Sequence, residues 1–224
     1  MFVYKGNAVQ THDLVKIDTE CFLDGAASFG DRVPEWAEEQ MRAVPYGVIR
    51  RGITDEHLLP IGVRGMQRNL RWATFCSSNA ILQVITPSQL LGYAIEPSRV
   101  KEIPALQSLE LLEARWSDLD EPWGPGGSVG FELATGFRVL RTGSDLDIVI
   151  RAAGPITNER AMCLCAQTMD LPAVVDIRVE TPATGFCLKE YARKDQAKVL
   201  LRTPEGMMLG SDPWCKCARS CMVQ

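Results

Sequence analysis

Two aspartates, Asp145 and Asp147, stand just before the apolar run 148–150 in the segment RTGSDLDIVIRA (141–152). This segment is rich in β-branched residues and has turn-forming residues at both ends, so it predicts a β-strand. Side chains two residues apart in a strand point to the same face, so the two carboxylates would lie side by side and repel each other. Either water hydrates them at an exposed edge, or they hold a divalent cation. Mg²⁺ fits such a pair, because it binds one or two carboxylates and fills its other positions with water and substrate phosphates.

A third carboxylate follows further along the chain. Asp176 lies inside the otherwise apolar run VVDI (174–177), which also predicts a strand. It either faces solvent on a half-exposed strand, where Arg178 and Glu180 share its face, or it faces a cleft. The strand pattern alone leaves both interpretations open.

A Gly-Ser dipeptide adds a possible phosphate site. Gly127 and Ser128 end the Pro- and Gly-rich stretch 121–128 and precede residues 129–135, which could begin a short helix. Glycine lets the backbone approach a ligand closely, and the amides at the start of a helix favour phosphate oxygens. The dipeptide is common in loops, so it indicates a site only together with the aspartates.

Three arginines stand close together near the end of the first third of the chain. Residues 66–76 are expected to form a helix, and a start one turn earlier would bring Arg64, Arg68 and Arg71 close to one face. This face is either solvated or meets anionic groups, which would be those of an acidic partner protein or of substrate phosphates.

The remaining pattern predicts a mixture of helices and strands. A connection marked by Pro97 and Pro104 separates an N-terminal module, residues 1–92, from a second domain, residues 93–224. We expect an α+β protein in which a mixed-sheet domain follows a smaller α/β module. The expected strands are 46–49, 81–85 and 174–180; the expected helices are 105–116 and 158–170, the latter capped by Asn158; 186–193 is a short strand or helix.

Composition narrows the class of protein. The chain has 224 residues and a net charge of −4, which argues against general nucleic-acid binding. No apolar run approaches the roughly 20 residues of a membrane span, and the N-terminus lacks a signal-peptide pattern, so a cytoplasmic protein is expected. Eight cysteines, including Cys163 and Cys165 and the tail set Cys215, Cys217 and Cys221, are expected to be free thiols rather than a zinc site.

The candidate site residues, taken together, resemble a known motif. Gly127 and Ser128, then Asp145 and Asp147 around a hydrophobic residue, then Asp176 on a further strand are similar to the motif of the nucleotidyltransferase superfamily. The resemblance implies a nucleotidyltransferase-like mixed-sheet domain. It also favours the metal interpretation of the aspartates.

Longer stretches resemble a particular family, the phosphoribosyl-dephospho-CoA transferases of malonate decarboxylase, which are also called malonate decarboxylase holo-acyl-carrier-protein synthases. The resemblance covers nearly the whole chain up to Cys215. It is carried by THDLV (11–15), GVRGMQR (62–68), ITPSQL (85–90), WGPGGSVGFELATG (123–136), SDLDIVIRA (144–152), VDIRVETPATGFCLKEYAR (175–193), VLLRTPEG (199–206) and SDPW (211–214).

This resemblance implies a magnesium-dependent transfer of phosphoribosyl-dephospho-CoA from triphosphoribosyl-dephospho-CoA to a serine of the apo acyl carrier protein subunit of malonate decarboxylase. Pyrophosphate would leave. Neither nucleic acid nor membrane would take part.

The resemblance also implies residue roles. Asp145, Asp147 and Asp176 would be catalytic and hold the metal, and Asp176 would also orient or deprotonate the serine hydroxyl; substrate-binding residues would be Gly127, Ser128, Ser144, Arg64 and Arg68. Two alternatives stay open: a nucleotidyltransferase of other specificity, which primes the citrate lyase carrier or transfers AMP to a protein, and a non-catalytic module that binds a carrier protein or a CoA derivative.

Overall fold

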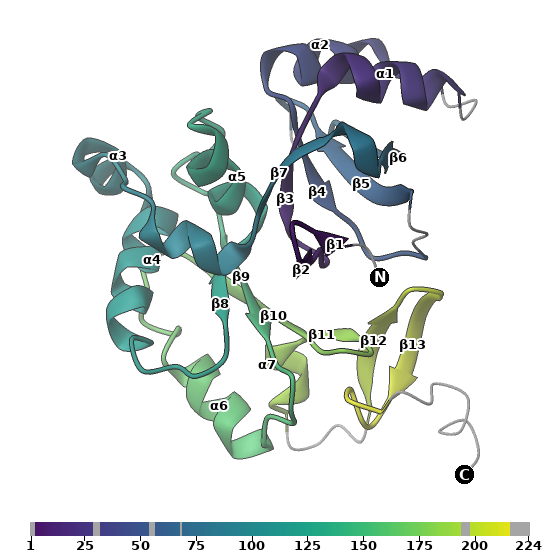
Figure 1. Ribbon diagram of the computed structural model, residues 1–224. Coiled ribbons are helices and arrows are strands. Elements are labelled where there is room, and N and C mark those ends of the chain that lie inside the picture. Colours follow the sequence, from purple (N-terminus) through teal and green to yellow (C-terminus); the bar gives the residue numbers. More distant parts are fainter. Residues whose placement is uncertain (1–2, 29–31, 54–56, 68, 194–197, 216–224) are drawn as a thin grey trace.

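The computed structural model describes residues 3–28, 32–53, 57–67, 69–193 and 198–215 and contains two large β-sheets (Figure 1). Arg68 and the tail cysteines Cys217 and Cys221 therefore lie outside the described residues. A small hairpin of β1 (Val3–Tyr4) and β2 (Asn7–Ala8) precedes the first sheet.

The first sheet is antiparallel and has the strand order β6-β5-β4-β3-β7. Its strands are β3 (Leu14–Ile17), β4 (Tyr46–Ile49), β5 (Leu58–Arg64), β6 (Arg71–Ser77) and β7 (Ile81–Ile85). Helices α1 (Thr19–Ser28) and α2 (Glu35–Ala43) cover one face, where Phe22 and Met41 pack against Ile17 and Ile61. Short 3₁₀ turns follow at Ser78–Ala80 and Pro87–Gly92.

The second sheet is mixed and has the order β13-β12-β11-β10-β9-β8. Its strands are β8 (Trp123–Pro125), β9 (Leu146–Arg151), β10 (Val175–Glu180), β11 (Gly185–Cys187), β12 (Val199–Thr203) and β13 (Gly206–Gly210). Strands β9 and β10 run parallel, and the other pairs of this sheet run antiparallel. The helices of this part are α3 (Pro97–Glu102), α4 (Pro104–Arg115), α5 (Gly127–Thr135), α6 (Asn158–Ala166) and α7 (Leu188–Tyr191).

Alternation along β9 and β10 gives the second sheet one apolar and one polar face. Leu146, Ile148 and Ile150 join the core that α4 and α6 help to form, and Ile177 and Val179 of β10 do the same. Because the side chains of a strand alternate, the opposite face presents Asp147 and Arg151 from β9 and Asp176, Arg178 and Glu180 from β10. This polar face is turned toward the first sheet, as the ion pairs described below show.

Helix α5 connects the two sheets. Phe131 of α5 is buried in a cluster with Leu14 and Ile85 of the first sheet. Further along, Glu132 accepts a hydrogen bond of 2.7 Å from Arg99 of α3. Helix α5 is thus fixed on both sides.

The α+β class is confirmed, as are the strands at 46–49 and 81–85 and the helix that buries Leu106, Leu109 and Leu112. The predicted helix at 66–76 is wrong, because residues 71–77 form strand β6, in which buried and exposed side chains alternate. Gly65 closes the β5–β6 turn with a hydrogen bond from its N–H to the Leu70 carbonyl. The cap of α6 is Thr157, not Asn158.

Two further expectations from the sequence concern membrane-spanning helices and the state of the cysteines. Within the described residues, none of the helices is both long and apolar enough to cross a membrane. Cys163 and Cys165 are free cysteines rather than disulfide partners. The division near residue 92 stays a prediction.

Candidate active site

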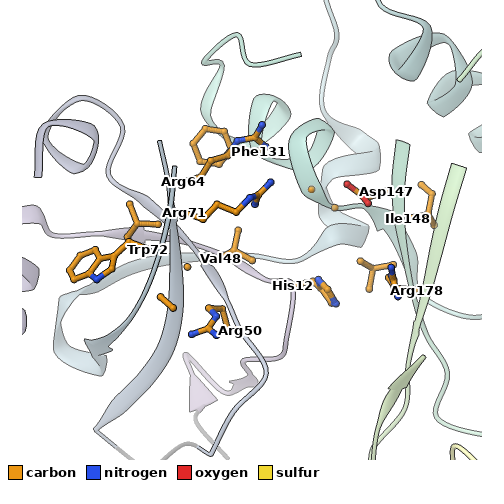
Figure 2. A pocket seen from close by; sticks show the side chains of 16 residues that line it. His12, Val48, Arg50, Arg64, Arg71, Trp72, Phe131, Asp147, Ile148 and Arg178 are labelled. Carbon is orange, nitrogen blue, oxygen red and sulfur yellow. The ribbon is translucent and has the colours of Figure 1, made fainter. Parts of the chain in front are cut away.

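A cavity of about 480 Å³ lies between the two sheets (Figure 2). The second sheet and α5 contribute Asp147, Arg178 and Gly127 to its lining, and the first sheet and its loops contribute further residues: His12, Arg64 and Arg71. Asp147 and the two arginines of the first sheet point into the space from opposite sides. The cavity therefore combines a carboxylate with cationic groups that can bind anions.

The parallel pairing of β9 and β10 brings Asp147 and Asp176 together. The two residues are direct neighbours in the register, so their side chains leave the same face of adjacent strands, about 4.8 Å apart. Burial raises the pKa of Asp147, and the carboxylates of Asp176 and Asp145 raise it further. Asp145 precedes the strand, is exposed, and lines a second cavity together with Ser144.

The carboxylates differ in their existing partners. Asp176 accepts a hydrogen bond of 2.7 Å from Arg178 and one of 3.6 Å from the Cys187 thiol. The Asp147 carboxylate accepts no hydrogen bond within the described part of the chain.

These carboxylates fit a cation that needs few protein ligands. In the described ranges, no three His, Cys, Asp or Glu side chains form a ready metal cluster. Asp147 and Asp176 are nevertheless adjacent, and their mutual repulsion would be relieved by a positive ion. Two carboxylates suit Mg²⁺, which takes its other ligands from water and phosphate.

The N-terminus of α5 adjoins the Asp147 carboxylate. The Gly126 N–H donates to the Asp147 carbonyl at 2.8 Å, which fixes the helix start on β9. Gly127 has a φ of +53°, and a Cβ there would lie 1.9 Å from Asp147 Oδ2. Only glycine fits this approach, and the amides of the first helical turn consequently lie beside the cavity.

Ser128 and the predicted arginines also meet at this point. Arg64 donates a hydrogen bond of 2.7 Å from Nη1 to the Ser128 hydroxyl. Arg64 and Arg71 are register partners at the turn end of the β5–β6 hairpin, and both line the cavity. Arg64 and Arg71 are therefore close together, as expected from the sequence, but a hairpin and not a helix brings them together.

Ser144 lies apart from this group. Its hydroxyl accepts a hydrogen bond of 3.0 Å from the Arg141 N–H, which closes a turn before β9. It lines the second cavity and not the arginine-lined one. Its predicted contact with substrate therefore requires a ligand that reaches past Asp145.

Comparison with known families decides where this chain belongs. Residues 10–87 match the model described as phosphoribosyl-dephospho-CoA transferase MdcG N-terminal domain, and residues 91–213 match the corresponding C-terminal domain. The chain belongs to the phosphoribosyl-dephospho-CoA transferase family.

Curated relatives agree with this assignment. A protein of Klebsiella pneumoniae subsp. pneumoniae named phosphoribosyl-dephospho-CoA transferase is 35% identical over 91% of this chain and 95% of its own length. Relatives of the same name from Pseudomonas aeruginosa and Azotobacter vinelandii are 35% and 34% identical, over 84% and 92% of this chain and 88% and 94% of their own. No solved structure matches.

In this member of the transferase family, the loop that precedes β3 is tied to the polar face of the second sheet. Asp13, which is fully buried, accepts a hydrogen bond of 2.5 Å from Arg151. Glu180 forms a contact of 3.0 Å with His12 Nε2 and an ion pair with Arg51. Glu180, which shares a face of β10 with Asp176, is thus already engaged at the other end of this strand.

Sequence reasoning missed His12 as a lining residue of the cavity. It is separated from Glu180 by 168 positions in the chain. The only local signal is that a histidine and a buried aspartate stand together before the strand, which indicates a polar contact but not its partner.

Proposed function

We propose that this protein transfers phosphoribosyl-dephospho-CoA from triphosphoribosyl-dephospho-CoA to a serine of the apo acyl carrier protein of malonate decarboxylase and releases pyrophosphate. Family membership supports the transferred group, since the relatives carry that name. The observation that carries the proposal is the cavity in which Asp147 faces Arg64 and Arg71, because a triphosphate needs both cationic groups and metal-binding carboxylates.

The residues of the candidate active site would have separate roles in the reaction. Asp147 and Asp176 would hold Mg²⁺, with Asp145 at the edge of the site, and the ion would offset charge on the attacking and leaving oxygens. The amides at the start of α5 and the Ser128 hydroxyl would bind the pyrophosphate end of the precursor. Arg64 and Arg71 would pair with the same phosphates from the opposite sheet.

One experiment tests the proposal directly. Apo carrier protein is incubated with the protein, triphosphoribosyl-dephospho-CoA and Mg²⁺, and the carrier is weighed by intact-mass spectrometry while pyrophosphate is assayed. We expect the mass of the carrier to increase by one phosphoribosyl-dephospho-CoA group at a single serine, with an equal amount of pyrophosphate.

Parallel reactions separate the alternatives. Modification of a citrate lyase carrier in preference to the malonate decarboxylase carrier, or transfer of AMP when ATP replaces the precursor, would assign a different specificity. Binding of the precursor without any modification would indicate a non-catalytic module.

The arginine side of the cavity gives a first prediction. Arg71→Gln should weaken precursor binding by about 10- to 100-fold, because a hydrogen bond to a charged group contributes about 1.5–3 kcal/mol. The loss should be larger at low salt, since screening weakens the wild-type contact as salt rises. Calorimetric titration at two ionic strengths measures both effects.

The matched control for this variant is Arg42→Gln. Arg42 is exposed on α2 and pairs with Glu38 and Glu20, on the covered side of the first sheet. The same loss of affinity in both variants would contradict a specific role for Arg71.

A second prediction concerns Asp176. Asp176→Ala should lower turnover strongly while precursor affinity changes little, because the lost interaction is one that acts in the transition state. Turnover and melting temperature are measured on the same preparation. Unchanged turnover with a stability change below about 0.5 kcal/mol would make Asp176 a surface residue. A large fall in melting temperature would make it a structural partner of Arg178.

A further inference from the structure

The proposed transfer requires a group that accepts the proton of the attacking serine hydroxyl. Among the described residues that line the cavity, only Asp147 and His12 can accept a proton. Asp147 is the proposed ligand of the cation, and a carboxylate that shares its charge with a cation is a poor base. Asp176, beside the cavity, already receives hydrogen bonds from Arg178 and Cys187.

The contacts of His12 leave one ring nitrogen available. Glu180 is ion-paired with Arg51, so its carboxylate accepts the hydrogen bond of 3.0 Å and His12 Nε2 carries the hydrogen. The lone pair is then on Nδ1, which receives no hydrogen bond from the residues that the structure describes. The side chain keeps 31% of its surface exposed and lines the cavity that also contains Asp147.

The backbone holds the ring in this position. His12 has a φ of +74°, a left-handed conformation that is uncommon for a residue other than glycine and is often found at functional sites. Its N–H donates to the Ile49 carbonyl at 2.9 Å, and the next residue, Asp13, is held by Arg151. Figure 2 shows the side chain between Val48 and Arg178, among the residues that line the cavity. The ring is therefore preorganised rather than free to rotate away.

Burial and the surrounding charges keep the His12 ring neutral, and the charges make it responsive to an anion. Burial first, and then the charges of Arg51, Arg151 and Arg178, together lower the pKa of His12 to about 4, while Asp147 acts in the opposite direction. Of these three arginines, Arg178 lines the cavity, and a triphosphate bound there would offset its charge. The ring would then become more basic when the precursor is present.

We propose that His12 Nδ1 accepts the proton of the carrier serine, with Glu180 as the residue that positions the ring. The serine Oγ forms a bond to the α-phosphorus, the bond from that phosphorus to the pyrophosphate oxygen breaks, and the proton passes to Nδ1 and afterwards to water. This inference rests on the proposed function.

Two variants separate a proton acceptor from a structural contact. His12→Gln retains an N–H donor that can reach Glu180, but it has no basic nitrogen in place of Nδ1. His12→Gly suits the positive φ and leaves space for free imidazole. His57→Gln is the matched control, since His57 is exposed and does not line the cavity.

Each variant is assayed with the natural carrier and with a carrier whose acceptor serine is replaced by cysteine. A thiol has a pKa near 8.5 and needs much less help to ionise than a hydroxyl. With the serine carrier we expect a 10²- to 10⁴-fold lower kcat in both His12 variants, at unchanged precursor Kd. The deficit should be at least about tenfold smaller with the thiol carrier, and imidazole should restore part of the activity of His12→Gly.

The opposite results overturn the inference. A kcat within about threefold of wild type in either variant would exclude His12 as the acceptor, since a general base contributes about 10²-fold or more. Equal deficits for both carriers, without rescue by imidazole, would reduce His12 to a structural contact of Glu180. Absence of transfer by the wild-type protein would instead overturn the proposed function, and this inference with it.

Discussion

Asp147→Asn is expected to abolish transfer while the fold stays intact. If Asp147 holds the proposed cation, its loss should remove several kcal/mol of transition-state stabilisation, which at about 1.4 kcal/mol per tenfold predicts a turnover lower by about 10³-fold or more. Asp145→Asn should have the same effect if Asp145 also holds the cation. Intact-mass spectrometry of the carrier protein over time measures both turnovers.

Stability should respond in the opposite direction to activity. The pKa of Asp147 is raised by burial and by the neighbouring carboxylates. A carboxyl group with a raised pKa stabilises the fold only at acidic pH, and this contribution is lost as the pH rises through the folded-state pKa. At neutral pH the Asn side chain therefore removes repulsion, and the melting temperature should stay the same or rise.

Cation binding gives an independent measurement. Mg²⁺ or Mn²⁺ should raise the melting temperature of the wild-type protein and have a smaller effect on Asp147→Asn. Asp118→Asn, at an exposed position of the chain, is the control. Near-normal turnover of Asp147→Asn with normal metal dependence would refute the metal assignment.

Gly127→Ala should be nearly as damaging, although it adds a single methyl group. The new Cβ would lie 1.9 Å from Asp147 Oδ2 and 2.7 Å from its carboxyl carbon, so the carboxylate or the start of α5 must move. A displacement of about 1 Å at a reacting centre costs about 10²-fold in rate. The left-handed backbone adds strain of about 1–2 kcal/mol, which in a chain of this size lowers the melting temperature by about 2–8 °C.

Gly154→Ala is the matched control for this substitution. Gly154 is exposed, and a Cβ there would meet no atom within 4 Å. Turnover and melting temperature are measured for both variants. Equal turnover in the two would show that the contact between Gly127 and Asp147 is unimportant for the reaction.

The β9 strand shows how much local pattern predicts. Its alternation of acidic and aliphatic residues predicted a strand with carboxylates on one face, and Asp147 does lie opposite the core residues Ile148 and Ile150. The neighbour of Asp147, however, depends on the register between β9 and β10, which are joined by α6. A pattern within one strand contains no information about that register.

The arginine hairpin shows where the pattern misleads. Arg64 and Arg71 are seven positions apart, which is close to two turns of a helix, and the same spacing is available across a tight hairpin. Burial alternates along residues 71–77, but the buried side chains are Thr74 and Cys76 while Phe75 is exposed, so hydrophobicity in the sequence does not show the alternation of a strand. Arg68 lies outside the described residues, so its predicted role in substrate binding stays a prediction.

The attachment of His12 to Glu180 could not be predicted from local sequence. The contact joins a loop before β3 to the end of β10 and exists only once the two sheets have docked. No periodicity or turn signal encodes such a pair. The family resemblance covers both segments, but it does not show that they are in contact.

The position of α5 has a consequence for how new specificities could arise in this family. Its first turn adjoins Asp147, and Phe131 packs against Leu14 and Ile85 of the other sheet. A β5–β6 hairpin taken from another relative would therefore change the cationic groups that meet the substrate and leave the carboxylates in place, as long as the packing around Phe131 is kept. The arginines of this hairpin and the carboxylates of β9 and β10 lie on separate stretches of the chain, so they can diversify one at a time.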